Sequence, residues 1–125
     1  MAILPEEVSQ AWEAKKGPII LTTVDAQGTP NSIYATCTEK YDGETLVVAN
    51  NFFSKTMENI KANTRACLLF ITEENAAYQI KGRIEYHTQG PVFDHMKQWN
   101  PKKHPGHGAA ALKVEEVYKG AERLA

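Results

Sequence analysis

Six short β-type runs, separated by tight turns, restrict the fold of this 125-residue chain more than any other feature. They are rich in β-branched and aromatic residues, or they alternate apolar and polar side chains. The runs expected to form strands are 19–24, about 31–39, 45–50, 66–72, 77–88 and 111–118. Because hairpin-type turns join several of them, the chain is expected to be mainly β with an antiparallel sheet.

The turns and the residue pattern of each run make this expectation more specific. The segment 25–29 reads as a hairpin loop, and Asp42-Gly43 is a pair favoured where a turn needs a positive φ, so the run 45–50 should pair antiparallel with its predecessor. The run 77–88 alternates as a strand does when one face meets water. The run 66–72 is uniformly apolar, which predicts burial on both faces.

Three short amphipathic helices are expected between the strands. Their expected positions are 5–16, about 55–62 and about 91–99. Gly17-Pro18 and Asn100-Pro101 end the first and the third helix. For the second helix, Ser54 is the expected N-cap and Asn63 the expected left-handed C-terminal cap.

This order of elements favours a small closed antiparallel barrel or a strongly curved sheet. Closure is favoured because it removes exposed strand edges. The whole chain, residues 1–125, is expected to be one domain, which is long enough to bury about two thirds of the surface that its unfolded form exposes.

Charge and hydropathy exclude several classes of function. The 14 Lys and Arg residues are balanced by 15 Asp and Glu residues, and the formal net charge is -1, so the chain lacks the basic field of proteins that bind nucleic acid or anionic membranes. Its apolar runs are too short to span a bilayer, and its N-terminus lacks the basic and apolar segments of a signal peptide. A cytoplasmic protein is expected, with Cys37 and Cys67 as reduced core residues.

Familiar catalytic and metal-binding motifs do not occur in the sequence. It has no GxGxxG, GxxxxGKS/T, HExxH or EF-hand loop, and none of its serines lies in a GxSxG elbow. His104 and His107, with His95 nearby in the chain, lack a carboxylate or thiolate companion, so a solvated loop is expected there rather than a metal site. No catalytic acid, base or nucleophile stands out.

The stretch 45–63 is the best candidate for a functional site, because a strand runs there into the start of a helix. Ser54, Lys55 and Thr56 occupy that start, where the first backbone N–H groups have no partner within the helix and the macrodipole adds partial positive charge. Backbone donors, hydroxyls and a cation together suit a phosphate group. The same residues are also common in ordinary helix capping, so spacing alone leaves both interpretations open.

Aromatic residues near loops are a second candidate feature. Tyr34, Phe52, Phe53 and Trp99 all neighbour expected loops. There, their rings either flank a flat ligand or complete the core, and the sequence pattern does not decide between the two.

Motifs along almost the whole chain resemble a known family. They are Gly28-Thr29-Pro30-Asn31-Ser32, Asp42-Gly43, Leu46-Val47-Val48, the Lys55-Thr56 pair followed by Glu58-Asn59-Ile60, Gly82 and Gly90-Pro91. In order and spacing they resemble the FMN-binding split-barrel family that includes the pyridoxamine 5′-phosphate oxidase-like proteins, and they are most similar to its small single-domain members. The resemblance implies a six-stranded antiparallel split β-barrel.

The resemblance also implies a cofactor and its site. FMN would lie at a homodimer interface and serve in electron transfer or in an oxidoreductase reaction, with a reduced nicotinamide or a redox protein as partner. The resemblance assigns the phosphate to Ser54, Lys55 and Thr56, and the ribityl chain to Asn31, Ser32 and Ile33. It assigns the edge of the ring to the main chain of Val48, Ala49, Asn50 and Asn51. It also implies that residues near Trp99 and in the C-terminal tail reach the flavin from the partner subunit.

Two other functions remain open. The barrel can hold haem or another ligand without catalysis, with an axial ligand from His87, His95, His104 or His107, or it can be a dimerisation domain without a cofactor. The longer oxidases carry an arginine-rich substrate end, whereas this chain has only Arg123 near its tail. Oxidation of pyridoxamine phosphate is therefore not expected.

Overall fold

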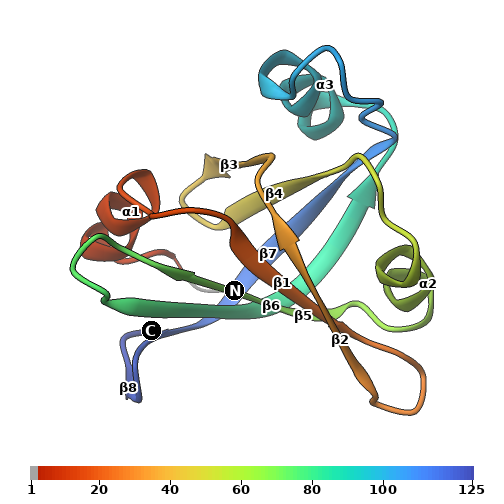
Figure 1. Ribbon diagram of the computed structural model, residues 1–125. Coiled ribbons are helices and arrows are strands. Elements are labelled where there is room, and N and C mark those ends of the chain that lie inside the picture. Colours follow the sequence, from red (N-terminus) through yellow and green to blue (C-terminus); the bar gives the residue numbers. More distant parts are fainter. Residues whose placement is uncertain (1–2) are drawn as a thin grey trace.

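A computed structural model describes residues 3–125, which form one antiparallel sheet with three short helices (Figure 1). The elements in chain order are α1 (Glu6–Glu13), β1 (Ile19–Val24), β2 (Pro30–Ala35), β3 (Thr38–Asp42), β4 (Thr45–Asn50), α2 (Lys55–Ala62), β5 (Arg65–Ile71), β6 (Ala77–His87), α3 (Pro91–Trp99), β7 (Gly108–Lys119) and β8 (Glu122–Arg123). Within residues 3–125, no helix is long and apolar enough to cross a membrane.

The sheet curls into a half-barrel whose strand order is β2-β1-β5-β6-β7-β4-β3, with β8 added beside β7. Strand β7 joins the two halves of this sheet, because it pairs with β6 along most of its length and with β4 through 108–113. Figure 1 shows α1 and α2 at opposite sides of the curled sheet, with α3 apart from both. The predicted class, a mainly β chain with short helices and a split antiparallel barrel, is confirmed.

The inner face of the curl holds the main apolar core. Its largest fully buried side chains include Trp12, Leu21, Leu68, Ile80 and Leu112. The ring of Trp12 packs edge-to-face on Phe70, with centroids 5.3 Å apart, and so attaches α1 to the sheet. These contacts place the core where the alternating strand pattern predicts it.

A second, smaller core lies under α3. Met96 is fully buried there, against Val47 of β4 and three alanines of β4 and β7. The alanines are Ala49, Ala109 and Ala111. Their small side chains leave room for the helix to lie close to the sheet.

The predicted run 31–39 is two strands rather than one. Strand β2 pairs with β1 at one edge of the curled sheet, and β3 pairs with β4 at the other edge. The chain therefore has to leave one edge and join the other at 36–37, and this transition breaks the run. Together with the two-residue β8, it raises the strand count from the predicted six to eight.

The prediction that 66–72 is buried on both faces is wrong. Burial alternates along β5, and Leu69 and Ile71 are each 37% exposed on the outer face of the sheet. Because the helices within residues 3–125 leave this face uncovered, an apolar residue there does not imply burial.

The predicted ends of several elements also differ from the structure. Asn63 is extended, with φ -156° and ψ 125°, and its side chain accepts the Arg65 N–H, so it is not the expected left-handed cap. Gly43 has no positive φ, and the Asp42 carboxylate closes its turn by accepting the Glu44 N–H. Helix α1 ends three residues before the expected boundary, and β7 begins three residues earlier than expected.

The close approach of β6 and β7 at Gly82 gives a test of this fold. A Cβ at Gly82 would collide with the main-chain carbonyl of Lys113, beside the bulge between Lys81 and Gly82. Gly82→Ala should therefore lower the free energy of unfolding by about 3 kcal/mol. The matched control is Gly43→Ala, whose Cβ would meet only Ile3 at 3.7 Å and should change stability by less than about 0.5 kcal/mol. Urea unfolding of both variants measures this, and equal stabilities would contradict the packing described at Gly82.

Candidate functional site

Helix α2 begins directly after the turn that follows β4, and its first turn has no side-chain cap. Ser54 occupies the predicted N-cap position, but with φ -128° and ψ -88° its hydroxyl makes no capping hydrogen bond. The first backbone N–H groups of a helix have no partner within it. At α2 the N–H groups of Lys55 and Thr56 have no partner within residues 3–125, whereas the Met57 N–H donates to the Ser54 carbonyl at 3.1 Å. Of these two residues only Lys55 is exposed to an anion.

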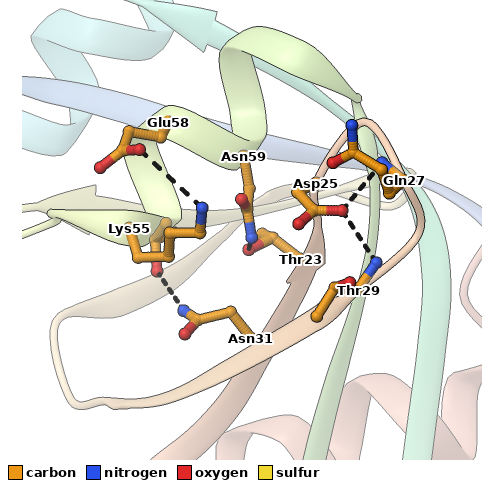
Figure 2. Close-up of polar contacts among 9 residues, drawn as sticks. Thr23, Asp25, Gln27, Thr29, Asn31, Lys55, Glu58 and Asn59 are labelled. Carbon is orange, nitrogen blue, oxygen red and sulfur yellow. Dashed lines mark hydrogen bonds and ion pairs between the residues drawn. The ribbon is translucent and has the colours of Figure 1, made fainter.

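The side chains at this helix start face two ways. Lys55 is exposed, and its only ion pair within the described chain is a loose one with Glu58 at 3.9 Å. Thr56 is 1% exposed, and its hydroxyl accepts a hydrogen bond from Asn31 Nδ2 at 3.4 Å. The dashed line that runs from Asn31 to α2 in Figure 2 marks this contact. The structure thus brings Asn31 into contact with Thr56, beside Lys55, but it turns the Thr56 hydroxyl inward.

A polar contact beneath α2 fixes the helix on the sheet. Asn59 Nδ2 donates to Thr23 Oγ1 at 3.1 Å, and both residues are 1% exposed (Figure 2). The other amide atom of Asn59, Oδ1, is buried and has no hydrogen-bond partner within residues 3–125. Since buried polar groups are stable only when paired, the Thr23 contact sets the position of α2 on β1.

The β1–β2 hairpin brings a carboxylate toward the start of α2. Asp25 Oδ1 accepts the N–H groups of Gln27 and Thr29, each at 2.9 Å (Figure 2). These backbone donors, Thr29 foremost, lower the pKa of Asp25, and the nearby charge of Lys55 lowers it further. An anion at the helix start must therefore share Lys55 with Asp25 and Glu58.

A groove of about 340 Å³ lies beside this helix start. Two segments line it together with His104: residues 33–37, from the end of β2 onward, and residues 49 and 51–53, before α2. Tyr34 and Phe52 are 75% and 76% exposed at its sides. This volume lies at the lower end of the range for small-molecule sites, which are mostly apolar with a few polar groups.

The two asparagines between β4 and α2 use their side chains within the protein. Asn50 Nδ2 donates to the Tyr86 hydroxyl at 2.7 Å, and Asn50 Oδ1 accepts the Phe53 N–H at 3.0 Å. Asn51 pairs with the side chain of Asn100. Asn51 lines the groove and Asn50 does not, and neither amide is free to bind a ligand.

Much of the main chain along 48–51 is also engaged. Strand β4 lies between β3 and β7, and the Ala49 N–H donates to the Cys37 carbonyl at 2.9 Å. The Asn51 N–H donates to the Ala49 carbonyl, and the Asn50 carbonyl accepts the His107 N–H. A ligand along this stretch therefore meets a backbone whose hydrogen bonds are largely made.

Three other predicted site residues lie apart from one another. Ile33 lines the groove, whereas Ser32 points to the outer face and shares a 2.8 Å hydrogen bond with the Thr22 hydroxyl. Trp99 packs in the small core under α3, where its Nε1 donates to His95 Nδ1 at 3.2 Å. Trp99 is therefore not in the groove of its own chain.

Some groove residues were not predicted as part of the site. His104 was expected in a solvated loop, and no spacing in the sequence connects it to the distant 49–53 segment. From the sequence, Tyr34, Phe52 and Phe53 were expected either to flank a flat ligand or to complete the core, and all three line the groove. Cys37 also lines it, whereas Cys67 lies outside, with a thiol whose pKa burial raises.

The sequence matches the model of the pyridoxamine 5′-phosphate oxidase family over residues 4–119. An uncharacterized protein of Methanocaldococcus jannaschii is 27% identical over 120 residues, which cover 92% of this chain and 79% of that protein. The family match therefore extends over both the groove and the helix start.

Solved structures with this fold include proteins of different described functions. HupZ of Group A Streptococcus superposes with a TM-score of 0.79 at 22% identity, covering 93% of this chain and 98% of that one. An FMN-binding protein from Syntrophomonas wolfei has a TM-score of 0.73 at 18% identity, with 85% and 78% covered. HutZ, a haem storage protein from Vibrio cholerae, has a TM-score of 0.67 at 16% identity, with 94% and 95% covered. At these identities the similarity shows the fold alone.

Proposed function

The chain belongs to the pyridoxamine 5′-phosphate oxidase family, and from this premise we propose that it is an FMN-binding flavoprotein that takes part in redox chemistry. One observation carries the proposal: a groove flanked by exposed aromatic rings adjoins an uncapped helix start that bears Lys55. FMN combines a flat ring system with a phosphate, so it suits both parts of this arrangement. The similarity to an FMN-binding protein of the same fold supports the choice of cofactor.

The phosphate is proposed to lie at the start of α2. Lys55 supplies the cation, Ser54 an exposed hydroxyl, and the first turn of the helix supplies backbone N–H donors at its positive end. Thr56 supports this site from beneath, because it is 1% exposed and its hydroxyl is already bonded to Asn31. The helix start thus offers an anion site whose donors the fold itself leaves unpaired.

The ring and the ribityl chain are proposed to follow the groove away from α2. Ile33, which lines the groove, flanks the ribityl chain, and the ring lies along 48–51 between Tyr34 and Phe52. Because the main chain there is largely engaged, stacking and shape hold the ring more than hydrogen bonds to its edge do. The mainly apolar lining excludes water from the ring face.

Bound FMN supplies transfer of a hydride or of single electrons. The chain's own residues then bind the phosphate, orient the ring and control what approaches it. Both redox modes expected from the sequence, hydride acceptance from a reduced nicotinamide and electron exchange with a protein, are compatible with the exposed rings of Tyr34 and Phe52. We also propose a cytoplasmic location, where the two free thiols stay reduced.

A homodimer is proposed to complete the site. On the outer face of the sheet, Tyr34 pairs in register with Ile20, and Ile20 with Leu69, so apolar side chains form a row across three strands. Leu69 and Ile71 are each 37% exposed in this region, and Tyr34 also lines the groove. A second copy seated on this row would therefore cover the open side of the groove, as a second subunit should in a barrel too small to enclose a flavin.

Haem binding is the second candidate function. His104 lines the groove and is half-buried, which places one imidazole beside the space that a flat ligand would occupy. The similarity of fold to a haem storage protein supports this alternative. Haem binding, unlike FMN binding, needs no phosphate site at the start of α2, so the two proposals differ in whether that helix start takes part.

The absorption spectrum of the purified protein distinguishes these candidates. With FMN added, the protein should retain flavin bands after gel filtration. A Soret band that forms with added haem and disappears in His104→Ala would favour haem instead. A protein that retains neither cofactor would contradict both assignments and support a dimerisation domain without a cofactor.

Removal of the Lys55 charge should weaken FMN binding. Lys55→Ala is expected to raise the FMN Kd about ten- to hundredfold, the contribution of one hydrogen bond to a charged group. The matched control is Lys61→Ala, which removes the same charge from the last turn of α2. Quenching of flavin fluorescence measures both constants, and equal Kd values for the two variants would place the phosphate elsewhere.

A charge within the apolar row should prevent dimerisation. Leu69→Glu places a carboxylate where the second copy is proposed to pack, so the dimer Kd should rise more than about tenfold. The control, Gln98→Glu, adds the same charge at an exposed position of α3. Sedimentation equilibrium measures the masses, and a Leu69→Glu protein as dimeric as the wild type would exclude this face as the interface.

A further inference from the structure

A buried pair of amides joins the turn after β4 to the end of α3. Asn51 Nδ2 donates to Asn100 Oδ1 at 3.0 Å, and Asn100 Nδ2 donates to Asn51 Oδ1 at 2.9 Å. The two residues are 7% and 4% exposed, although 49 positions separate them in the sequence. Because amides removed from water are costly unless they are paired, this reciprocal contact holds α3 against the end of β4.

The same amide also holds the segment 101–107, which follows α3. The Gly106 N–H donates to Asn51 Oδ1 at 3.0 Å, and Lys97 Nζ donates to the Pro105 carbonyl at 3.0 Å. Gly106 has a φ of 54°, and a Cβ there would lie 3.0 Å from Lys97 Nζ. Hydrogen bonds to Asn51 and Lys97 therefore hold the segment 101–107 at the point where it turns back toward β7.

These contacts fix the place of His104. Its N–H donates to the Pro101 carbonyl at 2.9 Å, and three residues later the His107 N–H donates to the Asn50 carbonyl at 2.8 Å. The His104 ring packs edge-to-face on Phe52, with centroids 5.6 Å apart and an angle of 89° between the planes. One wall of the groove is thus formed by a side chain whose backbone is held on both sides.

We propose that Asn51 and Asn100 are positioning residues that hold His104 as a fixed wall of the groove, and that this wall contacts the ring of the bound flavin. The proposal rests on the proposed function, because it takes the groove as the place of the ring. Asn51 acts through the segment 101–107 rather than on the ligand, since both ends of its amide are engaged within the protein. A wall that is already ordered lowers the entropy cost of binding.

Riboflavin is a suitable probe for this wall, because it carries the ring and the ribityl chain of FMN without the phosphate. Asn51→Ala and His104→Ala should each raise the riboflavin Kd about three- to tenfold, the value of one aromatic contact. The matched control is Thr72→Val, which removes a buried polar group in the β5–β6 turn and should leave this Kd unchanged. Fluorescence quenching measures all of these constants.

The double variant Asn51→Ala/His104→Ala separates positioning from an independent contact. If Asn51 acts through His104, the double variant should bind riboflavin no more weakly than the weaker single variant. Hydrogen exchange of the ligand-free protein should be faster across 101–107 in Asn51→Ala but not in His104→Ala. Additive losses of affinity, or unchanged exchange in Asn51→Ala, would overturn the positioning role.

The remaining outcomes also decide the proposal. His104→Ala leaves the amide pair intact, so it tests the wall even if Asn51→Ala does not fold. A wild type that binds FMN and riboflavin, with an unchanged riboflavin Kd in His104→Ala, would overturn the wall and leave the proposed function in place. A wild type that binds neither flavin would overturn both.

Discussion

The pairing of β7 with both β6 and β4 is the constraint on which the rest of the structure depends. Strand β7 joins the two halves of the curled sheet, and its approach to β6 requires glycine at position 82. Through β4 it also determines where the chain enters α2, because β4 is buried along its whole length and ends at the turn that carries Asn50 and Asn51. The groove and the helix start are therefore adjacent because of strand pairing. The pairing of the strands alone is enough to place the groove next to the start of α2.

Polar contacts then refine what the strands bring near one another. Asn59 and Thr23 fix α2 on β1, Asn50 and Tyr86 fix the turn before α2, and Asn51 and Asn100 fix the segment that bears His104. Each contact is buried or half-buried, so each is stronger and more costly to break than a surface hydrogen bond. What remains exposed at the site is chemically simple: one lysine, unpaired backbone donors and several aromatic rings. Such a surface suits a cofactor that itself supplies the reactive chemistry.

The local elements were largely predictable from the sequence, whereas long-range geometry was not. The bounds of β1, β4 and α2 follow from β-branched runs, alternation and helix-start chemistry, and the structure has them as predicted. The break at 36–37 depends on β2 and β3 lying at opposite edges of the sheet, and the exposure of Leu69 depends on which face the helices leave open. Asn51 holds the segment that carries His104 beside the groove. Local sequence patterns do not reveal this long-range contact. The flavin itself was inferred from family resemblance, and the residues alone left open whether the helix start is an anion site or ordinary capping.

The most direct test of this account is a titration of the isotope-labelled protein with FMN, followed by the amide resonances in NMR spectra. The account predicts that the largest shifts fall in two groups, the start of α2 around Lys55 and the groove segments 33–37 and 49–53. Shifts confined to other parts of the sheet would contradict the assigned site. No shift at FMN concentrations that saturate a typical flavoprotein would contradict the assignment of FMN as the cofactor.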